Sequence, residues 1–148
     1  MSPAVLRGYL YFVMVGLFVQ GVGSLLFRLH PAMATDSPLL VRGAFGIDFW
    51  HSWIHILWGA AGAVLLTRWR TMRAAVGLAL VFGVFYTAFG VLGVTVHHPL
   101  GLELDVFENT FHLTAGPLTL ILGLLGLRSL AASSAVVEAA PTSEPAAP

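Results

Sequence analysis

DFWHSWIHILWG, at residues 48–59, and DVFENTFHLTAG, at residues 105–116, are two copies of one pattern. In each copy an Asp opens the segment, a His follows seven residues later, and a Gly lies four residues after the His. The apolar segments before them match too, because the spacing G-xxx-Q-xx-G at 16–23 recurs as G-xxx-T-xx-G at 83–90. The repeat predicts two similar helical hairpins, related by a twofold axis along the membrane normal.

The composition is that of an integral membrane protein. Only 9% of the 148 residues are charged and 57% are hydrophobic, whereas a soluble domain has about 25% charged residues. The net charge is zero, which gives no support to a nucleic-acid partner. The chain has no cysteine and no lysine, which excludes disulfides, thiolate metal sites and Schiff-base chemistry.

Four apolar segments are long enough to cross a bilayer as helices of roughly 20 residues. We place them near residues 9–29, 49–67, 74–96 and 106–127. Runs of this length exclude barrel strands, so the predicted fold is an all-α membrane protein with four transmembrane helices. The domain covers residues 1–130. Residues 131–148 are rich in Ala, Pro and Ser, which predicts a disordered cytoplasmic tail.

Arginine placement predicts the orientation, since cytoplasmic loops carry an excess of basic residues. Five of the seven arginines fall at one end of the predicted bundle: Arg7, Arg68, Arg70, Arg73 and Arg128. We therefore expect a multi-pass protein of the bacterial inner (cytoplasmic) membrane with both termini in the cytoplasm. All six histidines then lie toward the outer side, including His97 and His98 in a loop.

The polar residues of the two repeated segments form the candidate site. His51 and His55 are four residues apart and share a helix face, and Glu108 and His112 hold the equivalent places in the second copy. If the second and fourth helices run parallel, three imidazoles and a carboxylate converge beneath the outer loops. Ionisable groups at membrane depth are costly and are candidates for function.

Three interpretations of this cluster remain open. In the first, the histidines are structural and bond to carbonyls or to Asn109, Thr110 or Thr114. In the second, His55 and His112 are axial ligands of a tetrapyrrole, either haem or a chlorophyll-type pigment, with Gly23 and Gly90 making room for the macrocycle. In the third, a divalent metal binds to four ligands: His51, His55, Glu108 and His112.

The motifs of several enzyme classes are missing, because the chain has no Walker A, Gly-x-Ser-x-Gly or His-Glu-x-x-His sequence. We therefore expect that the protein is not an enzyme on its own. The leading prediction is a structural or accessory subunit of a larger respiratory or photosynthetic membrane complex, in contact with lipid and with other membrane subunits. The alternatives are a tetrapyrrole-binding electron-transfer or pigment protein, and an outer-face metal-binding or small-solute transport protein.

The segment NTFHLTAG at residues 109–116 matches an N-x-x-H-L-x-x-G pattern. In this it resembles a domain-of-unknown-function family of small four-helix bacterial membrane proteins, over residues 7–127. A similar His-x-x-x-Gly element begins the second helix in that family, and His55 with Gly59 echoes it without the Asn. The resemblance implies the four-helix topology and a role for His55 and His112, but no known activity. A looser similarity to DoxX-type membrane proteins extends only to size.

Overall fold

The computed structural model describes residues 1–36, 38, 44–96, 99–102 and 104–138, and within these ranges it is helical, without strands. The elements are α1 (Pro3–Leu29), α2 (Pro31–Asp36), α4 (Phe49–Arg68), α5 (Met72–Val96), a short 3-10 helix η1 (Pro99–Gly101) and α6 (Val106–Glu138). By length and hydropathy, α1, α4, α5 and α6 are able to cross a membrane. The prediction of an all-α chain with four such helices is confirmed. His97 and His98 lie outside the described residues.

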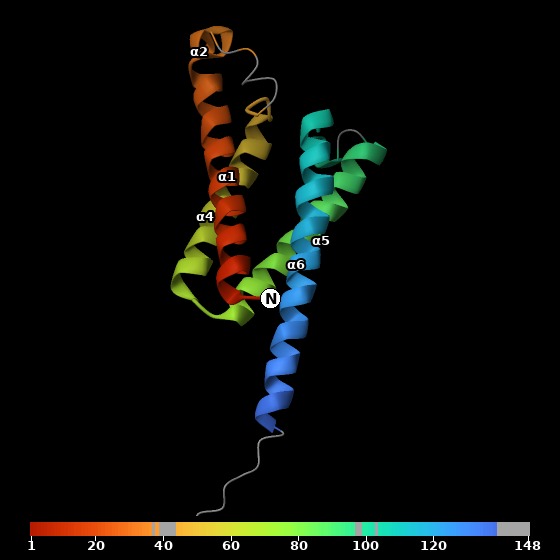
Figure 1. Cartoon of the computed structure of the whole chain (residues 1–148). Coiled ribbons are helices and arrows are strands. Elements are labelled where there is room, and N and C mark those ends of the chain that lie inside the picture. The colour runs from red at the N-terminus through yellow and green to blue at the C-terminus, as the bar shows by residue number, and fades with distance from the viewer. Residues whose placement is uncertain (37, 39–43, 97–98, 103, 139–148) are drawn as a thin grey trace, which may run out of the picture.

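Helix α6 extends further than the sequence predicts. We expected the span to end near Leu127 and the tail to begin at residue 131, whereas the helix continues to Glu138. The reason is local, because residues 131–138 contain alanines that favour a helix and no proline or glycine to end it. The end of α6 therefore extends beyond the other helices (Figure 1). The remainder of the predicted tail, residues 139–148, lies outside the described residues.

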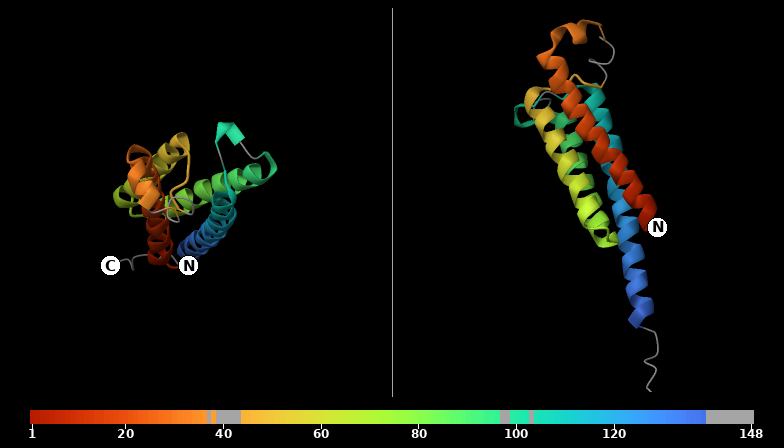
Figure 2. Two further views of the ribbon diagram at one scale, coloured as in Figure 1. Left: turned by 90° about the horizontal axis from the view of Figure 1, so that it is seen from above. Right: turned by 90° about the vertical axis from the view of Figure 1, so that its left-hand side faces the viewer.

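The helices pack as two hairpins. The most extensive contacts join α1 to α4 and α5 to α6, and the contacts between the two pairs are fewer. The view along the bundle shows the two pairs diverging from each other (Figure 2). This pairing agrees with the sequence repeat, while the twofold relation between the hairpins stays a prediction.

Glycines allow the close approach within each hairpin. A Cβ atom at Gly59 would lie 2.5 Å from the carbonyl oxygen of Met14 on α1, and one at Gly116 would lie 2.5 Å from the amide nitrogen of Thr87 on α5. In lipid, helices associate through packing of this kind, since no hydrophobic effect draws them together. The equivalent glycines of the repeat thus perform the same task in both hairpins.

Gly16 does not pack against a neighbouring helix. The spacing G-xxx-Q-xx-G puts Gly16, Gln20 and Gly23 on one helix face, which predicts a shared helix contact, but a Cβ at Gly16 would meet no atom within 4 Å. Its repeat counterpart Gly83 behaves as expected, because it lies against the backbone of Leu120. The difference arises from the divergence of the hairpins, which leaves one face of α1 without a neighbour.

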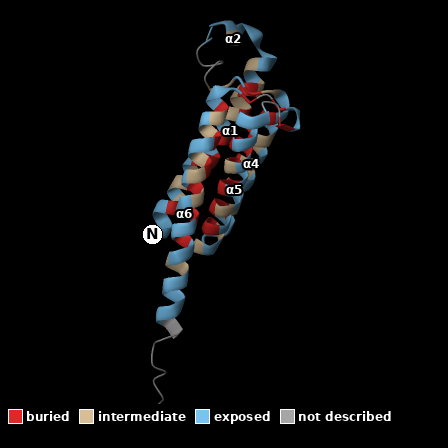
Figure 3. Cartoon of the chain, turned by 90° about the vertical axis from the view of Figure 1, so that its right-hand side faces the viewer, coloured by how far each residue is buried: buried red, intermediate tan, exposed pale blue. Residues whose placement is uncertain are grey.

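The hydrophobic core lies where the hairpins meet. Leu6, Leu10 and Met14 of α1 are fully buried, together with Phe82 and Ala79 of α5. Buried residues run through the middle of the bundle while the outward faces stay exposed (Figure 3). Toward the arginine end, the hydroxyls of Tyr9 and Thr119 are 2.7 Å apart and connect α1 to α6. These contacts hold the two hairpins together at the end opposite the histidines.

A candidate metal centre

Three histidines from two hairpins converge at one point in the bundle. His51, His55 and His112 are each only 1% exposed. One ring nitrogen from each of them lies within 4.8 Å of one ring nitrogen of both others. The ring centroids of His51 and His55 are 4.5 Å apart, and that of His112 lies 5.6 Å from His51 and 6.3 Å from His55. The predicted convergence of the three imidazoles is confirmed.

The helix starts set this geometry. The side chain of Asp48 accepts a hydrogen bond of 2.9 Å from the backbone N–H of His51, and Asp105 accepts one of 2.9 Å from that of Glu108. Both aspartates are therefore N-caps, which fix where α4 and α6 begin. His51 and Glu108 follow their caps by three residues, and His55 and His112 follow theirs by seven. His55 and His112 therefore lie about 9 Å along the helix axis from the first residue of their helices.

Glu108 completes the cluster with a carboxylate. It is 4% exposed, and its Oε2 lies 3.3 Å from Nδ1 of His51. This confirms the prediction that a carboxylate lies beside the imidazoles. His51 and Glu108 come from different hairpins, so the contact between them crosses the interface between α4 and α6.

Gln20 on α1 fixes the orientation of His55. Its side-chain oxygen lies 3.0 Å from Nδ1 of His55. Since an amide oxygen only accepts, Nδ1 carries the hydrogen and donates it, and Nε2 is left with its lone pair. A hydrogen bond of this kind, from the ring nitrogen that does not face the site to a side-chain oxygen, is the usual support for a metal-binding histidine. Gln20 is polar and lies in an apolar helix, which predicts that its side chain points inward, and its contact with His55 confirms this.

Among the described residues, Nε2 of His55, Nδ1 of His112 and Oε1 of Glu108 are buried without a hydrogen-bond partner, whereas Nδ1 of His51 and Oε2 of Glu108 have only each other, at 3.3 Å. Leaving a buried polar atom unpaired costs about 1–3 kcal/mol, and more for a charged group. The structural interpretation expected these atoms to be satisfied by side chains nearby. Instead, the three side chains expected to do so donate to backbone carbonyls. Asn109 donates to Leu104 and Thr110 to Val106, while the hydroxyl of Thr114 lies within reach of the carbonyls of Thr110 and Phe111.

Aromatic side chains of α5 enclose the site, and the sequence analysis did not identify them. The ring of Tyr86 lies 5.0 Å from that of His112, and the ring of Phe89 lies 5.5 Å from it. The hydroxyl of Tyr86 is buried and has no partner among the described residues. A signal was present, because Tyr86, Phe89 and Gly90 share one face of α5 with the predicted packing glycines.

The glycines proposed to make room for a tetrapyrrole are covered by neighbouring side chains. A Cβ at Gly23 would collide with the ring of Phe45, and one at Gly90 would lie 2.9 Å from the side chain of Leu113 and 3.0 Å from Cβ of His112. The space beside His55 and His112 is filled by His51, Phe89 and Tyr86. The geometry thus favours a small ion over a flat macrocycle.

No protein-family model, curated protein or solved structure matches this chain. The resemblance carried by residues 109–116 therefore stays a prediction. What the site does has to be argued from its own chemistry.

Proposed function

We propose that this protein binds one divalent first-row transition-metal ion through His51, His55, His112 and Glu108. The observation that carries the proposal is the convergence of three buried imidazoles whose ring nitrogens lie within 4.8 Å of one another. The unpaired nitrogen and oxygen atoms of the cluster support it. A cation would give one donor atom of each of the four residues a partner and would balance the charge of the carboxylate.

The ligand types indicate the class of metal. Imidazole suits zinc, copper, iron and nickel, whereas magnesium and calcium prefer sites made of oxygen ligands alone. Zinc in a tetrahedral site binds nitrogen at about 2.0–2.1 Å, which puts neighbouring ligand atoms roughly 3.3 Å apart. For the three imidazoles, the observed upper limit of 4.8 Å requires only a small closing movement, and Glu108 would join them from its place 3.3 Å from Nδ1 of His51.

The centre would connect the two hairpins. His51 and His55 belong to α4, while Glu108 and His112 belong to α6, and these helices come from different hairpins. Four protein ligands are typical of a structural metal site, in which the bound ion adds directly to the stability of the fold. Such a role is compatible with an accessory subunit of a larger membrane complex, which stays a prediction of the sequence.

The test is the metal content of the purified protein, prepared in detergent with a tag that contains no histidine. We expect about one transition-metal ion per chain by mass spectrometry, no Soret absorption band, and loss of the ion in the variants His55→Gln and His112→Gln. His30→Gln is the matched control, because His30 is exposed at the end of α1 and should leave the metal content unchanged.

Acidification gives a second measurement on the same sample. Only the neutral imidazole binds metal, so protons compete with the ion. We expect the metal to be retained at neutral pH and to be released only when the pH is lowered well below the reference imidazole pKa of about 6.5. A preparation without metal after dialysis against zinc, iron or copper salts would refute the proposal. An intense Soret band that either single variant bleaches would favour the tetrapyrrole alternative instead.

A further inference from the structure

A cavity of about 310 Å³ opens between α1 and α6, in the space that the diverging hairpins leave. This volume is within the range of small-molecule pockets. Four phenylalanine rings line it: Phe12, Phe45, Phe107 and Phe111. Phe12 is 79% exposed and Phe107 48% exposed, so the cavity reaches the outer surface of the bundle, where lipid would surround these helices.

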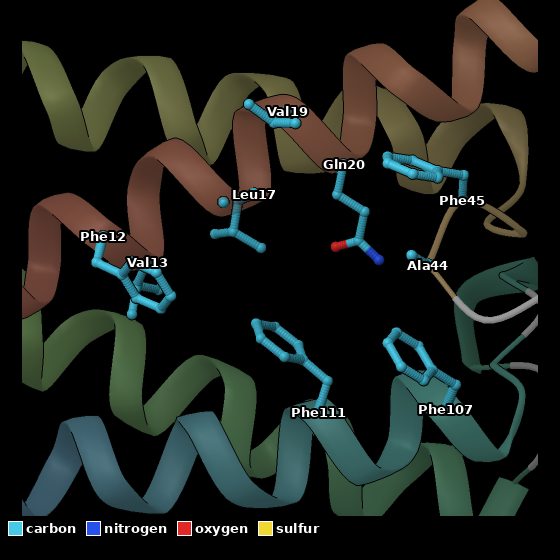
Figure 4. Close-up of a pocket in the computed structure, with 10 residues that line it drawn as sticks. Phe12, Val13, Leu17, Val19, Gln20, Ala44, Phe45, Phe107 and Phe111 are labelled. Atoms are coloured by element: carbon cyan, nitrogen blue, oxygen red, sulfur yellow. The ribbon is translucent and has the colours of Figure 1, made fainter. Parts of the chain in front are cut away.

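One polar side chain enters this apolar cavity. Gln20 lines it together with the phenylalanines, and its amide group points into the space between α1 and α6 (Figure 4). The oxygen of this amide is already occupied by His55. No described residue accepts a hydrogen bond from the amide nitrogen, so a donor remains for a molecule in the cavity. In an apolar cavity, a donor of this kind gains from any acceptor that it meets.

Gly16 gives the cavity its depth. It lines the wall one helical turn before Gln20, and a Cβ at this position would meet no protein atom within 4 Å. The glycines that bring α1 close to α4 are different residues, such as Gly21, whose Cβ would lie 2.5 Å from the carbonyl oxygen of Ser52. Gly16 therefore leaves space that no protein contact uses.

We propose that this cavity binds a lipid-soluble, planar conjugated ring that carries a carbonyl group and an apolar tail, which is the chemistry of a quinone. The ring would lie among the four phenylalanines, where offset and edge-to-face arrangements are favourable. Its carbonyl oxygen would accept from the amide nitrogen of Gln20, and its tail would leave between α1 and α6 toward the bilayer. A plain acyl chain would leave that donor unpaired, which is why the ring with a carbonyl fits better.

This site goes beyond the metal centre and does not require it. Gln20 is the one side chain that belongs to both, since it supports His55 with its oxygen and faces the cavity with its nitrogen. Ligand binding and metal content are therefore measured on the same samples, so that a failure of one proposal is distinguishable from a failure of the other.

The experiment compares two probes with the same decyl tail on a planar six-membered ring, decyl-benzoquinone, which carries carbonyl groups, and decylbenzene, which has none. Their binding to the detergent-purified protein is measured by titration calorimetry. We expect the quinone to bind at least fivefold more tightly than decylbenzene. Gln20→Leu should weaken quinone binding about five- to tenfold, which is the value of one hydrogen bond, and should leave decylbenzene binding unchanged.

A pair of glycine variants locates the site. Gly16→Leu fills the cavity and should weaken quinone binding at least tenfold while the metal content and the thermal unfolding midpoint stay at wild-type values. Gly8→Leu is the matched control, because Gly8 is also exposed on α1 with no atom within 4 Å of its added Cβ, but it does not line the cavity. It should bind like the wild type.

Three results would overturn the proposal. The first is equal affinity for both probes in the wild type, which would indicate an acyl-chain groove. The second is unchanged quinone affinity in Gly16→Leu, which would place binding elsewhere. The third is no saturable binding of either probe to a well-folded wild-type protein.

Discussion

Gln20 shows how much one side chain decides at the scale of the residue. Its position on α1 matches that of Thr87 on α5 in the sequence repeat, yet the two side chains do different work. Thr87 bonds to the carbonyl of Gly83 in its own helix, whereas Gln20 reaches across to the ring of His55 on α4. The longer amide therefore gives the first hairpin a support for a ligand that the second hairpin lacks.

We predict that Gln20→Leu weakens metal binding by about 10- to 100-fold, which is typical for loss of a group that orients a histidine ligand. The fold should persist, because the substitution keeps an apolar stem of similar length on a lipid-compatible helix. Competition with a chromogenic chelator measures the affinity. Thr87→Val is the control at the equivalent place in the repeat, and a similar loss of affinity there would contradict the orienting role of Gln20.

Glycine decides helix packing at the scale of the element. At Gly59 and Gly116 the opposing atoms are backbone atoms, of Met14 and Thr87 respectively, which cannot move aside without shifting a helix. At Gly126 the nearest opposing atom is Cγ2 of Val76 at 2.6 Å, followed by the flexible ends of Met72 and Met1 at 3.2 and 3.3 Å. All three belong to side chains, which can rearrange more easily than a backbone. The same residue type is therefore needed for different reasons at different places along the chain.

We predict that Gly116→Leu destabilises the bundle by at least about 1–3 kcal/mol, the usual cost of overpacking, whereas Gly126→Leu is tolerated better. The variant Gly77→Leu is the control, since an added Cβ there would meet no atom within 4 Å. Thermal unfolding in detergent measures the difference. Equal midpoints for Gly116→Leu and Gly77→Leu would show that the α5–α6 contact is looser than the structure indicates.

At the scale of the whole molecule, the two ends of the bundle differ in chemistry. One end is assembled around arginine: Arg7 donates to the carbonyls of Leu66 and Trp69 and so satisfies the end of α4. The other end carries the aspartate caps, the histidines and Glu108. The start of α1 and the end of α6 lie toward the arginine end (Figure 1), which predicts that both lie on one side of the membrane.

We predict that this side is the cytoplasm, because basic residues are retained there. Two reporters fused to the C-terminus of the protein test the topology. Alkaline phosphatase is active only in the periplasm, and a fluorescent protein of the usual kind is fluorescent only in the cytoplasm. We expect an inactive phosphatase and a bright fluorescent fusion in the bacterial host. The reverse result would invert the bundle and place the histidine cluster near the cytoplasmic surface.

The number of spanning helices, their approximate positions and the helix faces that carry the polar residues could be predicted from the sequence. Long apolar runs are sufficient to predict α1, α4, α5 and α6, because lipid requires each spanning segment to satisfy its own backbone. The spacing of four between His51 and His55, and between Glu108 and His112, is sufficient to put each pair on one face. The aspartates at 48 and 105 place both pairs at one depth.

The distances between the hairpins, and the contacts that depend on those distances, came from the tertiary structure. The contact of His51 with Glu108, the enclosure by Tyr86 and the cavity beside Gly16 all depend on how far the two hairpins diverge. The repeat predicts equal roles for Gly16 and Gly83, but one borders a cavity and the other packs against Leu120. The periodicity of a sequence is a property of one helix. The divergence of the two hairpins results from the packing of side chains on all four helices, so it cannot be read from any single segment of the sequence.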